Sequence, residues 1–211
     1  MDPRTGRSET SRLETFADGV MAIAITLLIL EIDVPEAGPG RSLASALADQ
    51  WPSYAAYAVS FITIGIIWVN HHHLFGVIER TTHAFLVLNV LFLMTIAALP
   101  WPTAVVAANI RDEAGRTAAA VAYGLTMTSI AIMFNAVWRY AAAGLRLLPP
   151  DVDPSELRRV HRSYLSGPIT YAVATLLALW SAWLSMGIFA ALAGYWLLPW
   201  SSPRIERLRS G

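Results

Sequence analysis

Residues 12–32 read RLETFADGVMAIAITLLILEI, and this stretch decides the fold of the chain. Its charged side chains stand near the two ends, and residues 19–30 carry none. An α-helix rises about 1.5 Å per residue, so the segment from Leu13 to Ile32 is about 30 Å long, the thickness of the hydrocarbon core of a bilayer. The apolar run is too long for a signal peptide and lacks an A-x-A cleavage context. It therefore predicts a retained transmembrane helix.

The composition of the whole chain agrees with membrane insertion. Of 211 residues, 55% are apolar and only 14% are charged, and the mean hydropathy is +0.49. A soluble domain carries about 25% charged residues, so this chain lacks the polar surface that it would need in water. Cysteine is absent, which excludes disulfides, thiolate metal sites and cysteine nucleophiles. The net charge of zero argues against a basic face for nucleic acid.

Similar apolar stretches recur along the chain and predict an all-α integral membrane protein with six transmembrane helices in one domain, residues 1–211. We expect spans at about Leu13–Ile32, Tyr54–Asn70, Ala84–Ala108, Thr117–Ala142, Leu165–Leu184 and Met186–Leu198. Pro100 and Pro102 interrupt the third span, because a proline has no N–H to donate within a helix.

The last two spans adjoin, so we expect a tight hairpin around Ser185–Gly187. The sixth span is short and ends in Trp196, Pro199 and Trp200, which is typical of a membrane interface. Before the fifth span, Pro149–Pro154 indicate a turn-rich connection, within which Asp153 and Ser155 are suited to cap a short helix over Glu156–His161.

Arginines predict the orientation in the membrane, which we expect to be the cell membrane. Cytoplasmic segments of membrane proteins are enriched in basic residues. With both termini cytoplasmic, residues 1–11, the connection 143–163 and the tail 201–211 lie on that side. Three arginines then face the opposite side: Arg41, Arg111 and Arg116. The cytoplasmic side holds Arg4, Arg7, Arg12, Arg80, Arg139, Arg146, Arg158, Arg159, Arg162, Arg204, Arg207 and Arg209.

The first helix has two faces of different chemistry. Because a helix turns about 100° per residue, one narrow stripe contains Phe16, Gly19, Ile23, Leu27 and Leu30, with Thr26 at its edge. Asp18 points to the opposite side. Aliphatic residues at this spacing commonly serve packing alone, but a ring of them also gates ions when a narrow apolar pore loses its water. The helix occurs once in the chain, so a symmetric pore built from it would need several copies.

Asp18 also has two interpretations. In the first, it is solvated by water near the membrane interface and helps to cap the helix. In the second, it reaches polar partners within its own subunit, because an unpaired charge in the membrane costs several kcal/mol.

The run Arg12-x-x-x-Phe16-Ala17-Asp18, followed by residues 22–28, resembles the Arg-x-x-x-Phe-Ser-Asp motif of the transmembrane protein 175 family of potassium channels. Trp68-x-x-His71-His72 and the segment from Asn89 to Thr103 are similar to the second and third helices of that family. The similarity covers roughly the first 110 residues. Ala17 replaces the motif serine, which removes one hydroxyl from the expected polar network.

The resemblance implies a homotetrameric, potassium-permeable channel with no cofactor, whose pore is lined by the first helix. It places the pore constriction at Ile23, with further rings at Leu27 and Leu30, and a potassium-selecting threonine at Thr26. The family lacks the Thr-Val-Gly-Tyr-Gly filter loop of ordinary potassium channels, and this chain lacks it too.

The resemblance also implies a polar network between helices of one subunit, formed here by Arg12, Phe16, Asp18, Trp68, His71 and Asn89. Trp68 and His71 are three residues apart and thus near one helix face. We expect Asp18 to accept a hydrogen bond from the Trp68 indole or from His71, and Arg12 to anchor elsewhere. The hypothesis is that this network fixes the rotation of the first helix.

A metal site, a secondary transporter and an enzyme fit the sequence less well. A metal site at His71–His73 would need side chains about 100° apart on a helix to converge. A proton-coupled secondary transporter, the alternative function, would need ionisable residues deep in several spans, and beyond Asp18 the spans have essentially none. An enzyme is not expected, because the chain has neither a Gly-x-Ser-x-Gly nor a His-Glu-x-x-His motif.

Overall fold

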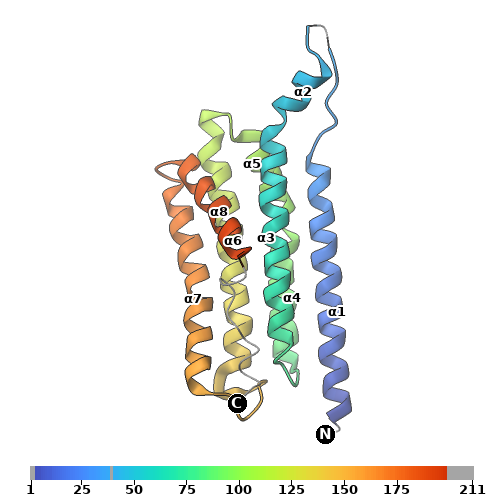
Figure 1. Ribbon diagram of the computed structural model, residues 1–211, viewed down its shortest axis with the longest axis vertical. Coiled ribbons are helices and arrows are strands. Elements are labelled where there is room, and N and C mark those ends of the chain that lie inside the picture. The colour runs from blue at the N-terminus through green and yellow to red at the C-terminus, as the bar shows by residue number, and fades with distance from the viewer. Residues whose placement is uncertain (1–2, 39, 199–211) are drawn as a thin grey trace.

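The computed structural model describes residues 3–38 and 40–198, and its elements are helices (Figure 1). Their bounds are α1 Pro3–Leu27, η1 Leu28–Glu31, α2 Leu43–Asp49, α3 Trp51–Phe75, α4 His83–Ala97, α5 Pro100–Asn109, α6 Glu113–Ala142, η2 Ala143–Leu145, α7 Pro154–Leu177 and α8 Ala182–Trp196. The long helices run side by side, and α2 with the segment before it projects beyond one end of the bundle. The all-helical class expected from the sequence is confirmed.

Four stretches of the described residues are long and apolar enough to cross a membrane: Glu9–Glu31, Trp51–Phe75, His83–Asn109 and Glu113–Leu145. They contain the first four expected spans, apart from Ile32 at the end of the first, so this is a multi-pass membrane protein. The remaining two helices differ: α8 is apolar but has 15 residues, and α7 begins with the polar sequence PSELRRVHRS.

The expected interruption of the third span is present. α4 ends at Ala97, and α5 begins at Pro100, where a proline is tolerated because the first N–H groups of a helix have no partner. A buried hydroxyl cluster then fastens α5 to its neighbours. The Ser60 hydroxyl oxygen of α3 lies 2.8 Å from the Thr103 hydroxyl oxygen of α5 and 3.2 Å from the Tyr123 hydroxyl oxygen of α6.

The hairpin expected around Ser185–Gly187 was placed wrongly. α7 ends at Leu177, and Ser181 caps α8 by accepting from the Leu184 N–H at 3.3 Å. Ser185 and Gly187 therefore lie inside α8. The sequence favours this start because serine satisfies a free N–H at a helix N-terminus, whereas a single glycine within an apolar helix is tolerated. Pro199 and Trp200 lie outside the described residues.

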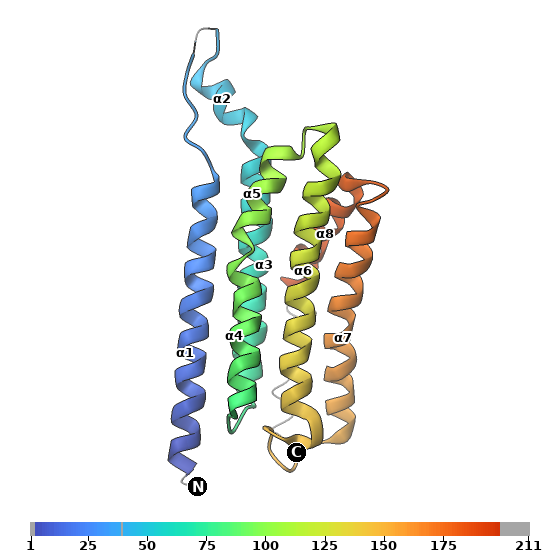
Figure 2. The ribbon, with the colours of Figure 1, turned by 180° about the vertical axis from the view of Figure 1, so that it is seen from behind.

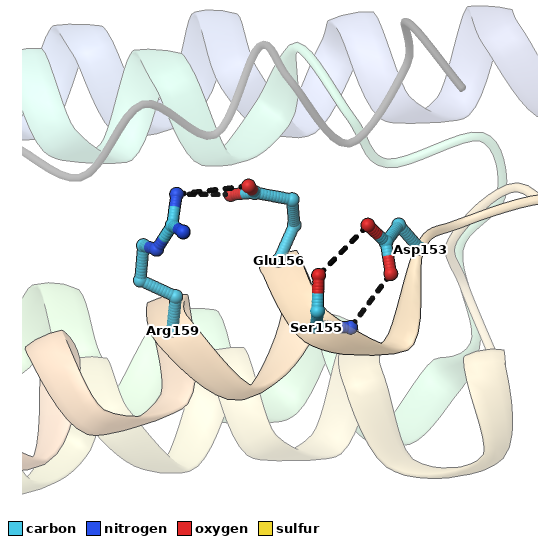
Figure 3. A network of polar contacts seen from close by, with 4 residues as sticks. All are labelled: Asp153, Ser155, Glu156 and Arg159. Atoms are coloured by element: carbon cyan, nitrogen blue, oxygen red, sulfur yellow. Dashed lines mark hydrogen bonds and ion pairs between the residues drawn. The ribbon is translucent and has the colours of Figure 1, made fainter.

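Asp153 starts α7 as expected, but the helix is not short. The carboxylate accepts from the Ser155 N–H at 2.7 Å and from its hydroxyl at 2.8 Å, and Arg159 pairs with Glu156 at 2.8 Å one turn later (Figure 3). The two bonds from Ser155 lower the pKa of the Asp153 carboxyl. The helix continues through Pro168 to Leu177, so the second half of the connection expected at 143–163 is helical.

α1 lies at one edge of the bundle, where it packs against α3 and α4 (Figure 2). α6 is central and has its most extensive contact with α7. The core between these helices contains fully buried aromatic side chains, among them Trp138, Tyr123, Phe85 and Phe92. Among the described residues, one long face of α1 has no neighbour.

Candidate functional site

The inner face of α1 is formed by small and flexible side chains. Ala17, Met21 and Ala24 of α1 and Leu28, the first residue of η1, follow one another at intervals of four, three and four residues, and all are buried. This spacing keeps them on one face of a helix. Ala17, the residue that departs from the family motif, thus lies in the contact between α1 and the rest of the subunit.

The outer face of α1 is apolar and exposed. The exposed fractions are 61% for Ile23, 42% for Leu27 and 72% for Leu30, and Phe16 is also exposed. The described part of the chain does not cover these side chains, which share one face as the sequence predicts.

The last turn of this face is not α-helical. Leu30 lies in η1, a 3-10 helix that begins at Leu28. A 3-10 helix has about three residues per turn, so Leu30 stands closer to the line above Leu27 than a continued α-helix would place it. The tighter turn thus places the Leu27 and Leu30 side chains nearly one above the other.

Thr26 is exposed at the edge of the same face. Its hydroxyl donates to the Ile23 carbonyl at 2.9 Å. This bond uses the hydroxyl proton and leaves the oxygen lone pairs available to accept. The side chain therefore presents oxygen rather than a donor.

Asp18 points back into its own subunit. The Trp68 indole N–H of α3 donates to Asp18 Oδ1 at 2.9 Å, which is one of the two partners expected from the sequence. The carboxylate is half-buried. A hydrogen bond to a charged acceptor is about twice as strong as a neutral one, so this contact joins α1 to α3.

His71 does not share this contact. Its ring is fully buried between Phe75 and Phe92, with centroid distances of 4.4 and 5.7 Å, and Nε2 lies 3.2 Å from Asn89 Oδ1 of α4. Asn89 also donates to the Phe85 carbonyl at 2.8 Å. Three residues correspond to about 300° on a helix, and the resulting offset of about 60° turns Trp68 toward α1 and His71 toward α4.

Arg12 has no hydrogen-bond or ion-pair partner within the described part of the chain, and its side chain is exposed. The anchoring contact that the sequence suggested for it is therefore not formed among the described residues.

Sequence reasoning missed Glu14 and His72. Nδ1 of His72 lies 3.0 Å from Glu14 Oε1, and the His72 ring stacks on Trp68 with centroids 6.0 Å apart. The spacing of these residues along their helices could have indicated the contact. Glu14 is four residues before Asp18, and His72 is four after Trp68, and such pairs lie one above the other on a helix.

Comparison with known proteins identifies the family. Residues 12–100 match the family model described as "Endosomal/lysosomal potassium channel TMEM175". A potassium channel of Streptomyces collinus is 45% identical over 190 residues, which cover 90% of this chain and 92% of the relative. The chain belongs to the TMEM175 family.

Structural comparison agrees with the TMEM175 assignment. The crystal structure of a potassium-selective TMEM175 homologue from Chamaesiphon minutus has a TM-score of 0.82 at 42% identity, covering 90% of this chain and 97% of that one. The chicken relative, named a proton channel, is 44% identical over 97 residues, 42% of this chain and 19% of the chicken protein. TMEM175 proteins are ion channels, and this member is not an enzyme. The matched residues 12–100 include α1 from Arg12 onward together with all of α3 and α4, and these helices hold every contact of Asp18, His71 and His72 described above.

Proposed function

We propose that this protein is a potassium-permeable channel in which four copies arrange α1 around a central pore. The observation that carries the proposal is the outer face of α1, an apolar stripe that the described residues of its own subunit leave uncovered. Around a fourfold axis, this stripe would surround a conduit with rings of Ile23, Leu27 and Leu30. Such rings narrow a pore and control whether water, and with it an ion, occupies it.

Within this proposal, Thr26 contributes to selectivity. Its exposed oxygen lies one turn from Ile23, where a partly dehydrated cation would find an acceptor. Conduction is passive and needs no cofactor, since the permeant ion crosses by diffusion.

We further infer that all six expected helices cross the membrane, with both termini on the cytoplasmic side of the cell membrane. α7 has 24 residues and rises about 36 Å, enough to span the core with its polar first turns at the interface. The end of the bundle at which α3 finishes and α7 begins is flanked by Arg80, Arg146 and Arg158, whereas Arg41 and Arg111 lie toward the other end. This asymmetry supports the orientation.

Reconstitution into liposomes tests the proposal. We expect potassium flux that exceeds sodium flux, proceeds without a proton gradient and does not saturate as a carrier does. Saturable flux coupled to protons would favour the secondary transporter instead.

Proton flux should be measured in the same vesicles, because the chicken and human relatives, which match 42% and 62% of this chain, are named proton channels. If the vesicles carried protons but no potassium, the permeant ion would be the proton. The proposed arrangement of α1 around a pore would be unaffected.

A further inference from the structure

α8 covers only part of the groove between α3 and α7. It contacts α3, α6 and α7, and its 15 residues rise about 22 Å, less than the hydrocarbon core of about 30 Å. In Figure 1 it ends part-way along the bundle, and α3 and α7 continue beyond it. A cleft lies at its last turn, between α3, α6 and α7, and Trp196 of α8 lines it.

The cleft has two adjoining parts, whose linings share Ile66, Asn70 and Trp196. The part along α3 has a volume of about 500 Å³, within the range of about 300–1,000 Å³ that is usual for ligand sites. The part between α6 and α7 adds about 90 Å³. Phe61 and Val69 line the larger part and are also exposed, so the cleft opens on the side of the bundle.

The lining of the cleft is apolar over most of its length and polar at one end. On α3 it runs from Phe61 to His73, a rise of about 18 Å, which is roughly half of a hydrocarbon core about 30 Å thick. Asn70 and His73 lie toward the end of the bundle where α3 finishes, and Ser163 of α7 lies toward the same end. This division matches a lipid of one leaflet, which has an apolar chain and a polar headgroup.

The polar end offers hydrogen-bond donors to an anionic headgroup. The Asn70 amide uses one N–H on the Ile66 carbonyl at 2.9 Å and has a second to donate. The Ser163 hydroxyl, at the cleft, has no partner among the described residues. Arg159 lies one turn before Ser163, and only its Nη1 is engaged, by Glu156 (Figure 3). Its other N–H groups are suited to a phosphate, and basic groups between membrane helices bind phospholipid headgroups.

Two glycines on facing helices widen the cleft. Gly65 of α3 and Gly167 of α7 both line it. A Cβ at Gly65 would meet no neighbouring atom of the described residues within 4 Å, and one at Gly167 would make an ordinary contact with the Ala131 Cβ at 4.0 Å. At Gly124, by contrast, a Cβ would collide with Thr175 of α7. Glycine weakens a helix, and one reason for its presence is the close approach of a ligand. An occupant of the cleft therefore accounts for Gly65 and Gly167.

We propose that the cleft binds one phospholipid from the adjacent leaflet, with an acyl chain between Gly65 and Gly167 and the phosphate at the polar end near Arg159. Lipid is the solvent at this depth of a membrane protein, and the guanidinium complements the charge of the phosphate. The bound lipid fills the space that the short α8 leaves and joins α3 to α7. The proposal shares with the proposed function only the membrane-spanning position of α7, and it does not depend on which ion the protein conducts.

Native mass spectrometry of the purified full-length protein, with dioleoyl phosphatidylglycerol added to the detergent, tests the proposal. We expect the wild type to retain one lipid per chain. Gly65→Leu and Gly167→Leu should each retain roughly tenfold less, because the leucine side chain displaces a few methylene groups of the acyl chain. The Tm of Gly65→Leu should not fall, since leucine favours a helix and enters open space.

The matched control is Gly187→Leu on α8. A Cβ at Gly187 also meets no neighbouring atom within 4 Å, and this glycine does not line the cleft. The control should retain lipid as the wild type does.

The polar end is tested by Arg159→Gln, which should lower lipid retention several-fold because a charge-assisted bond to the phosphate is lost. Arg158→Gln is its control. Arg158 is exposed and lies about 140° around α7 from Ser163, whereas Arg159 lies about 40° from it. The control should leave retention unchanged.

Equal retention by Gly65→Leu and Gly187→Leu would mean that the lipid is an adventitious additive only, and would overturn the proposal. So would unchanged retention in Arg159→Gln. A wild type without retained lipid would also overturn it. A disulfide in Gly65→Cys/Ser202→Cys would then show that residues 199–211, which follow Leu198 at the cleft, occupy it instead. Lipid retention as expected in a protein that carries no ion would count against the proposed function alone.

Discussion

At the scale of single residues, the need of Asp18 for a polar partner and the faces of α1 could be predicted from the sequence. The different contacts of His71 and His72 could not. A carboxylate on the side of α1 opposite the aliphatic stripe must find a partner in its own subunit, and Trp68 supplies it. His71 and His72 look equivalent in sequence. Only the packed orientation of α3 shows that His72 faces α1 with Trp68, and that His71 is buried against α4.

Removal of the indole donor should cost stability. In Trp68→Phe, the half-buried Asp18 carboxylate loses its hydrogen bond, and we expect the free energy of unfolding to fall by about 1–2 kcal/mol. Denaturant titration in mixed micelles measures the loss. Trp180→Phe is the matched control, since Trp180 is highly exposed and should tolerate the change. Equal effects of the two substitutions would show that Asp18 does not depend on Trp68.

At the scale of elements, helix ends followed the chemistry of caps more closely than the distribution of apolar residues. Pro100 marked the start of α5, and Asp153 marked the start of α7. The turn before α8 was placed wrongly because the hairpin was expected where two adjoining apolar spans meet, around Ser185–Gly187. Instead, the cap at Ser181 determines where α8 begins. Glycine requires no turn where the surrounding helix is packed in an apolar environment.

The cap of α7 gives a local prediction. Asp153→Ala removes the acceptor for both bonds from Ser155, so we expect faster amide exchange over residues 155–158 with little change elsewhere. The bonds lower the pKa of the Asp153 carboxyl. Their contribution is therefore present above the carboxyl's unfolded pKa and is lost as pH falls through the folded value.

Hydrogen exchange followed by mass spectrometry checks this prediction. Asp151→Ala, an exposed carboxylate two residues earlier with no hydrogen bond among the described residues, is the control. Unchanged exchange in Asp153→Ala would mean that the first turn of α7 is held by packing alone.

At the scale of the whole molecule, one subunit cannot enclose a pore with α1. The helix lies at the edge of the bundle (Figures 1 and 2), and the described residues leave its aliphatic face exposed. The sequence predicted which residues form this face, because helical periodicity alone determines it. What lies opposite the face depends on contacts between chains, which the sequence of one chain specifies only through family resemblance.

Cysteine cross-linking tests the contact between copies. The natural chain has no cysteine, so Ile23→Cys introduces a single thiol. If four copies of α1 surround one axis, oxidation in the membrane should produce disulfide-linked dimers, visible on a non-reducing gel. Ile169→Cys on α7, at 57% exposure, should remain monomeric. Cross-linking at Ile169 but not at Ile23 would place a different helix at the axis.

The most direct test of the central claim uses the same Ile23→Cys variant in liposomes during potassium flux. A small cationic methanethiosulfonate reagent attaches a positive charge to an accessible thiol. If Ile23 narrows the permeation path, the modification should block potassium flux in Ile23→Cys and leave Ile169→Cys unaffected. Continued flux through fully modified Ile23→Cys would contradict the account, because the ion would then cross without passing this side chain.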